Sequence, residues 1–124
     1  MGMKRALGIG GLFFRASDPR ALAEWYATHL GIEVMDQEGN GAPWQQQAGP
    51  TVFATFPTDT DYFGRPGQQW MVNFRVADLD AMLAQLRAGG APVEEKIQVM
   101  DGIGRFGWAA DPEGNRFELW EPAA

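Results

Sequence analysis

The chain has 124 residues, with 16 acidic and 10 basic side chains, a net charge of −6 and no cysteine. This length is enough for one domain with a hydrophobic core, and the missing cysteines exclude disulfides and thiolate metal sites. The acidic balance, without a lysine-arginine cluster, argues against nucleic acid as a partner. No apolar stretch predicts a membrane span or a secretory signal, so we expect a cytoplasmic protein without a membrane partner.

The first half of the sequence, about residues 7–57, predicts one helix and four strands. Residues 7–16 alternate and carry adjacent aromatics, which is typical of a strand, and Asp18 followed by proline is typical of a helix start. Apolar residues then recur on one helical face until Gly31, a residue suited to a left-handed cap. The three following strands are predicted at residues 32–35, 44–47 and 50–56.

The second half, about residues 69–122, follows a turn-rich crossover loop at residues 58–68 and predicts the same order of elements. A strand over residues 69–76 precedes Asp78, which is placed to cap a helix that ends at Gly89 and Gly90. Three strands are predicted after it, at residues 92–95, 105–110 and 115–120, the last two joined by a DPEG turn.

The two halves also share sequence. Residues 11–26 (GLFFRASDPRALAEWY) align with residues 71–86 (MVNFRVADLDAMLAQL), so that Phe14 matches Phe74 and Arg15 matches Arg75. Two related βαβββ modules are therefore predicted, in one domain of the α+β class. Two such sheets side by side would curl around a shared cavity, which is where we expect a site.

The doubled βαβββ order, the SDP before a helix ending in HLGIEV, and the terminal DPEGNRFELWEP resemble the vicinal oxygen chelate superfamily. That superfamily includes glyoxalase I, bleomycin-resistance proteins, fosfomycin-resistance enzymes and extradiol dioxygenases. The resemblance implies one domain over residues 1–124, whose two modules form a curved mixed sheet around a cup (the glyoxalase/bleomycin-resistance fold). Members often dimerise, so a homodimer is expected. Because the superfamily holds both enzymes and pure binding proteins, it leaves the activity open.

Carrying over the metal ligands of metal-using members gives Gly11, Ala54, Met71 and Glu118. Only Glu118 binds a hard or borderline divalent ion well, because glycine and alanine carry no ligand atom and methionine offers a soft thioether. The only histidine, His29, lies near the end of the first predicted helix and is interpreted as structural. The sequence therefore predicts neither a bound metal nor a cofactor.

The family positions also imply which side chains line the cup. Arg15 and Arg75 either hold an anionic or carbonyl-bearing ligand, as an arginine at the position of Arg15 holds the glutathione carboxylate in glyoxalase I, or form structural pairs with acids. Glu118 is either the partner of an arginine or a general base. The aromatic residues stack on a ligand or belong to the core. The predicted ligand-binding residues are Phe13, Arg15, Phe56, Met71, Asn73, Arg75 and Trp120.

The function that these residues favour is binding of a small organic molecule in an aromatic cup without a metal, for sequestration or resistance. The first alternative is a lyase or isomerase that uses an unconventional metal site or Glu118 as a base, with Arg15 or Arg75 stabilising an oxyanion. The second is a dimeric interaction module with a vestigial cavity. Whether the modules pair within one chain or between two chains stays open.

Overall fold

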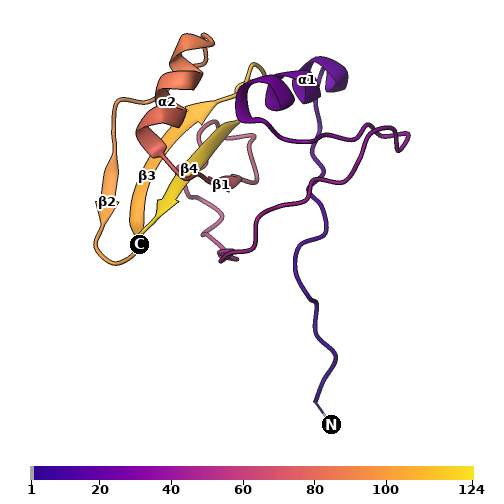
Figure 1. Ribbon diagram of the computed structural model, residues 1–124, viewed down its shortest axis with the longest axis horizontal. Coiled ribbons are helices and arrows are strands. Elements are labelled where there is room, and N and C mark those ends of the chain that lie inside the picture. Colours follow the sequence, from indigo (N-terminus) through magenta and orange to yellow (C-terminus); the bar gives the residue numbers. More distant parts are fainter. Residues whose placement is uncertain (1) are drawn as a thin grey trace.

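The computed structural model describes residues 2–124, in which two helices accompany one four-stranded sheet (Figure 1). In the strand order β1-β4-β3-β2, β1 is parallel to β4 and the other neighbours are antiparallel. This mixed sheet confirms the predicted α+β class. Within residues 2–124, no helix is long and apolar enough to cross a membrane. The elements in chain order are α1 (Pro19–Leu30), β1 (Asn73–Arg75), α2 (Leu79–Ala88), β2 (Gln98–Met100), β3 (Gly104–Ala110) and β4 (Arg116–Pro122).

Both helices begin where the sequence predicts. The Asp18 carboxylate accepts a hydrogen bond from the backbone N–H of Ala21 at 3.1 Å, and Asp78 caps α2 in the same way through Ala81 at 3.0 Å. α1 ends at Gly31, whose φ of 68° lies in the left-handed region that favours glycine. The two helices are therefore capped by the same kind of contact at matching positions of the repeated sequence.

The hydrophobic core lies between α2 and one face of the sheet. Alternate residues of β3 and β4 point toward the helix, while every third or fourth residue of α2 points back. α1 lies beside α2 and packs Trp25 and Tyr26 against Phe117, each with its ring centroid 6.1 Å from that phenyl ring. The buried cluster comprises Leu79, Leu83, Leu86, Ala109, Phe117 and Leu119.

A set of polar contacts, here named the α1 clasp, attaches α1 to the turn between β3 and β4. The Tyr26 hydroxyl donates to the buried Asp111 carboxylate at 2.7 Å. The Glu113 carboxylate accepts from the backbone N–H groups of Ser17 at 2.6 Å and Asp18 at 3.0 Å, just before the helix begins. The clasp therefore ties a first-half helix to the second-half sheet.

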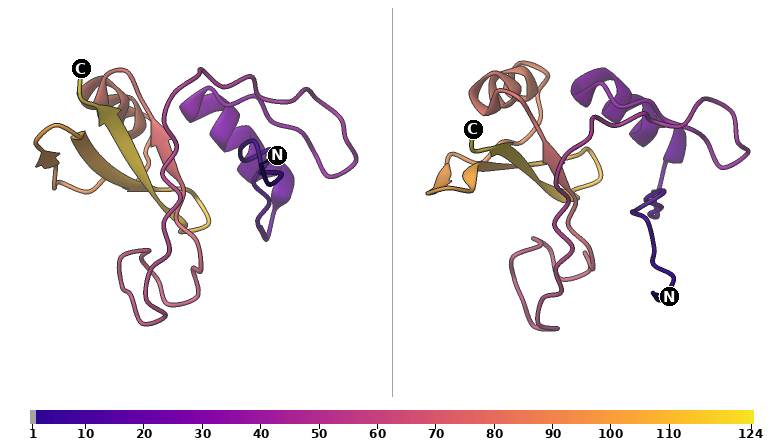
Figure 2. Two further views of the ribbon diagram at one scale, coloured as in Figure 1. Left: turned by 90° about the horizontal axis from the view of Figure 1, so that it is seen from below. Right: turned by 60° about the horizontal axis from the view of Figure 1, so that its bottom comes forward.

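The first-half strands predicted at residues 7–16, 32–35, 44–47 and 50–56 do not form in this single chain. Only an isolated bridge between Met35 and Gly41 is present there. Figures 1 and 2 show the N-terminal segment running away from the sheet. Phe13 is 96% exposed and Phe53 is 85% exposed. A strand needs a neighbouring edge to pair with, and these segments meet none within one chain.

Two strands of the second half also differ from the prediction. Residues 92–95 hold only a single bridge, from Val93 to Ala109, and the strand forms later, at Gln98–Met100. Pro92 has no N–H to extend the pairing in that earlier segment. β1 is shorter than the strand predicted at residues 69–76. The side-chain amide of Gln68 occupies the backbone groups of Arg116 that a longer β1 would use: it donates to the carbonyl oxygen at 2.7 Å and accepts from the N–H at 2.8 Å.

Candidate functional site

The face of the sheet opposite α2, here named the open face, gathers aromatic and charged side chains in rows. Strand registry pairs Asn73 with Glu118 and Glu118 with Trp108, which places these three side chains in one row. The next row contains Arg75, Trp120, Phe106 and Gln98. These two rows are the side chains of the open face from which a candidate site is built.

Glu118 is the centre of the first row and is only 9% exposed. Its carboxylate accepts hydrogen bonds from the Tyr62 hydroxyl, from the Trp108 indole N–H at 3.1 Å and from the Asn73 amide at 2.6 Å. These three donors occupy three of the about four positions at which a carboxylate accepts hydrogen bonds or binds a metal ion. Among residues 2–124, no arginine or lysine forms a salt bridge with Glu118.

Tyr62 is a site residue that the sequence pattern missed. Burial, together with the hydrogen bond to Glu118, raises the pKa of Tyr62 to about 12. Its ring stacks on Phe56, with centroids 5.6 Å apart and planes 6° from parallel. Tyr62 lies in the turn-rich crossover loop, where no helical or strand period marks which side chain points inward. Only the folded loop reveals its position.

Two cations flank the aromatic centre of the open face. The Arg116 guanidinium lies 5.2 Å from the centroid of the Trp108 ring and 5.4 Å from that of Tyr62, and the Lys96 ammonium lies 5.7 Å from Trp108. Arg116 also binds both oxygens of Glu94, at 2.7 and 2.8 Å, which holds the pKa of Glu94 below its usual value. Arg116 is thereby engaged in a salt bridge, whereas Lys96 lies over the Trp108 ring and acts on Glu94 only through the electrostatic effect of its charge.

Several predicted ligand-binding residues do meet on this face. The Arg75 guanidinium donates to the carbonyl oxygens of Gln47 at 2.8 Å and Ala48 at 3.5 Å. Trp120 is parallel to Phe106, with ring centroids 6.0 Å apart. Five of the seven predicted side chains therefore contact this face or residues that lie on it. They are Phe56, Met71, Asn73, Arg75 and Trp120.

Phe13 and Arg15 are not brought to this face in the single chain. Phe13 projects into solvent. Arg15 instead lines a separate hollow of about 590 Å³ with Ser17, Arg65 and Glu113. Arg15 and Arg75 occupy matching positions of the repeated sequence, but within one chain they have different surroundings.

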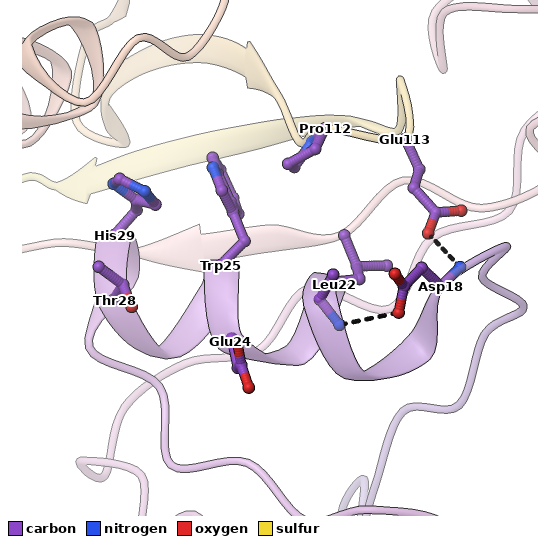
Figure 3. Close-up of a pocket in the computed structure, with 9 residues that line it drawn as sticks. Asp18, Leu22, Glu24, Trp25, Thr28, His29, Pro112 and Glu113 are labelled. Atoms are coloured by element: carbon purple, nitrogen blue, oxygen red, sulfur yellow. Dashed lines mark hydrogen bonds between the residues drawn. The ribbon is translucent and has the colours of Figure 1, made fainter.

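A further cavity, of about 330 Å³, lies between α1 and the turn that follows β3 (Figure 3). Leu22, Trp25 and His29 line it from the helix, and Pro112 and Glu113 line it from the turn. Hydrogen bonds from the backbone N–H groups of Asp18 and Ser17 hold the pKa of Glu113 below its usual value. The close-up shows the Glu113 carboxylate directed at the start of the helix, as part of the α1 clasp.

The side chains do not fit the metal site of the metal-using relatives. Gly11 and Ala54 offer no ligand atom, the Met71 sulfur lies 4.0 Å from the Arg116 guanidinium, and Glu118 already accepts three hydrogen bonds. Across residues 2–124, no group of three or more histidine, aspartate or glutamate side chains is placed to hold a metal ion.

Solved structures show what the fold is similar to. TnmS3, an antibiotic binding protein from Streptomyces sp. CB03234, is 26% identical, with a TM-score of 0.65 over 97% of this chain and 100% of that one. A lactoylglutathione lyase from Agrobacterium tumefaciens is 21% identical, with a TM-score of 0.57 over 95% and 96%. A glyoxalase/bleomycin resistance protein/dioxygenase superfamily member from Sphaerobacter thermophilus DSM 20745 is 22% identical, with a TM-score of 0.56 over 86% and 90%.

No curated protein matches the chain. A family model described as the glyoxalase-like domain matches residues 11–120, which covers both halves and includes the first-half segments that lack strands here. The match agrees with the capped helices, the mixed sheet and the solved structures of the glyoxalase/bleomycin resistance/dioxygenase superfamily. The chain therefore belongs to the family of glyoxalase-like domains.

Proposed function

We propose that this protein binds a small organic molecule on its open face without a metal, as a sequestration or resistance protein does. One observation carries the proposal. The Glu118 carboxylate accepts hydrogen bonds from three neutral side chains, and the parallel rings of Phe106 and Trp120 lie in the neighbouring row. Over these buried groups, the partly exposed ring of Phe106 and the exposed side chains of Lys96 and Gln98 offer apolar area and a few polar groups, which is what a small-molecule site needs. The similarity to TnmS3, an antibiotic binding protein, supports the same function.

Metal-dependent or base catalysis is less compatible with these contacts. A divalent ion needs several hard or borderline ligands. This face offers the carboxylate of Glu118, which accepts three hydrogen bonds, and that of Glu94, which is bound by Arg116. A general base needs a free lone pair directed at substrate, whereas Tyr62, Trp108 and Asn73 already donate to this carboxylate.

The proposal includes a homodimer in which a second chain completes the cup. The first-half segments at residues 7–16 and 50–56 expose apolar side chains, and the outer edges of β1 and β2 have no neighbouring strand within residues 2–124. Exposed apolar segments beside free strand edges favour pairing with another chain. In such a dimer, Phe13 and Arg15 of one chain can reach the open face of the other. The absence of cysteine fits a reducing cytosol.

Native mass spectrometry of freshly purified protein tests the assembly and any co-purified ligand together. The expected result is a dimer, with or without a bound organic molecule. Thermal-shift measurements with carboxylates, α-keto acids and planar aromatics then test binding, and at least one of these classes is expected to raise the melting temperature. A monomer that no compound of these classes stabilises would contradict both the dimer and the binding function.

A matched pair of variants localises the dimer interface. Phe53→Asp places a charge on an exposed apolar segment and is expected to weaken dimerisation, as measured by sedimentation velocity. Gln37→Glu adds the same charge at an exposed position of the same half and should leave the dimer unchanged. Equal dissociation of both variants would assign the effect to net charge and remove the support for a strand-mediated interface.

A further inference from the structure

The charge on the open face runs against the charge of the whole chain. Arg75, Lys96 and Arg116 provide three cations on this face, against the two carboxylates of Glu94 and Glu118. The face is therefore positive by one charge in a protein whose net charge is −6. A positively charged face attracts negatively charged ligands, even on a protein whose net charge is negative.

The cations differ in how far the protein itself neutralises them. Arg116 forms a two-point salt bridge with Glu94, and Arg75 donates to two backbone carbonyl oxygens of the first-half loop. Lys96 is exposed, and within residues 2–124 it forms no salt bridge. Its ammonium group lies 5.7 Å from the Trp108 ring, and its charge also acts on the nearby Glu94 carboxylate, which Arg116 already binds. Lys96 is thus the cation of this face that has no salt bridge of its own and is exposed to a charged ligand.

The surroundings of Lys96 define the shape of what it can bind. Strand pairing places Gln98 beside Phe106, so Lys96, two residues earlier on the same side of the chain, lies next to Trp108. The ring of Phe106, which is parallel to that of Trp120, lies in the adjoining row. Trp108 is only 1% exposed and Trp120 only 8%, so the ring that a ligand can contact is Phe106, which is partly exposed. A flat apolar group can pack on Phe106 while an acidic group attached to it reaches the ammonium.

We propose that the open face selects planar aromatic anions and that Lys96 is the residue that recognises their acidic group. The inference rests on the proposed binding function and adds the class of ligand. Arg75 lies at the opposite side of the sheet and is tied to the first-half loop, so it does not substitute for Lys96. The selectivity is electrostatic and decreases as salt increases.

The test uses two probes with the same ring and different charge. 2-Naphthoate is ionised at neutral pH, whereas 2-naphthamide is neutral, and the affinity of both is measured by isothermal titration calorimetry at low and high salt. The chain has only two lysines, Lys4 and Lys96, so Lys4→Gln is a control with the same charge change in the exposed N-terminal segment. Lys96→Arg keeps the positive charge and Lys96→Gln removes it.

The parent protein is expected to bind naphthoate more tightly than naphthamide. Lys96→Gln should weaken naphthoate binding about threefold to fivefold, the scale of a partly exposed ion pair, and leave naphthamide unaffected. Lys96→Arg and Lys4→Gln should keep the parent preference. Equal binding of both probes by the parent and Lys96→Gln overturns the role of Lys96 and leaves the binding function standing. Binding of neither probe by the parent contradicts the inference together with the function on which it rests.

Discussion

The hydroxyl of Tyr26 donates to the carboxylate of Asp111 at 2.7 Å, and both side chains are buried, although 85 positions separate them in sequence. Asp111 also binds the side chain of Asn115 at 2.8 Å, so the turn and the helix are held by one carboxylate. This relationship fixes α1, a first-half element, on the second-half sheet.

Tyr26→Phe should therefore loosen α1 without unfolding the chain. The loss of a buried hydrogen bond to a charged acceptor is expected to lower the free energy of unfolding by about 1.5 to 3 kcal/mol. Urea unfolding measures this change, and hydrogen exchange should accelerate at the amides of α1 more than elsewhere. Tyr62→Phe, which removes the other tyrosine hydroxyl, is the control and should leave exchange in α1 unchanged. Unaltered exchange in Tyr26→Phe would contradict the clasp.

The free energy of unfolding should fall at alkaline pH, because the pKa values of both tyrosines are raised in the folded protein. Burial raises the pKa of Tyr26 above its usual range, and burial with the Glu118 hydrogen bond raises that of Tyr62 from 10.0 to about 12. The unfolded chain loses these protons first, so the tyrosines add full stability below their unfolded pKa and lose it as pH rises through the folded values. Ultraviolet absorbance should show no tyrosinate in the folded protein near pH 10.0. A full signal there would contradict the buried hydrogen bonds.

Glu118→Gln tests whether the central carboxylate is needed as an acceptor. The new amide N–H₂ group would replace either Oε1, which accepts from Asn73, or Oε2, which accepts from Tyr62 and Trp108. At least one of the three hydrogen bonds is then lost, and the others no longer have a charged acceptor. The expected cost is about 1 to 3 kcal/mol of unfolding free energy. Glu33→Gln, at an exposed position, is the control with the same chemical change. A stability equal to that of the parent would show that the three hydrogen bonds contribute little.

Acid should weaken the start of α1 through Glu113. The pKa of Glu113 lies below its usual value because the backbone N–H groups of Asp18 and Ser17 bind its charged form. Its contribution is therefore present above the unfolded pKa, near 4.5, and is lost as pH falls through the lower folded pKa. In Glu113→Gln, the difference in unfolding free energy between neutral and acid pH should become smaller. An unchanged difference would assign the acid sensitivity to other groups.

Protein purified without chelators should carry no stoichiometric transition metal. The four positions that hold metal in metal-using relatives offer one carboxylate, that of Glu118, and it accepts hydrogen bonds from three other side chains. Elemental analysis by mass spectrometry measures the content directly. One tightly bound ion per chain that disappears in Glu118→Gln would overturn the metal-free proposal.

Local sequence signals predicted the helices, the family and the last two strands, because their causes lie within a few residues. Asp18 and Gly31 carry the cap chemistry of α1 in their own side-chain and backbone preferences. Residues 7–16 also carry a strand pattern. Alternation shows that a segment can form a strand, but it does not show whether the same chain contains a strand edge with which the segment can pair. This explains why the strand is absent in the single chain.

The candidate site was less accessible to sequence reasoning because its polar partners come from irregular segments. Alternation along β4 placed Glu118 and Trp120 on the open face, and the structure agrees. The donor from Tyr62 depends on how the crossover loop is anchored by Gln68, and no periodic pattern encodes that anchoring. The cation at Lys96 depends on β2 forming later than residues 92–95, where the strand was predicted.

The α1 clasp also determines the order in which the chain can fold. Its hydrogen bonds join residues that are 85 to 96 positions apart, whereas β1, α2, β2, β3 and β4 are contiguous in sequence. On the ribosome, α1 emerges well before the turn that receives it. The clasp can therefore close only after the β3–β4 hairpin has been synthesised, although its helix is the first element to be made.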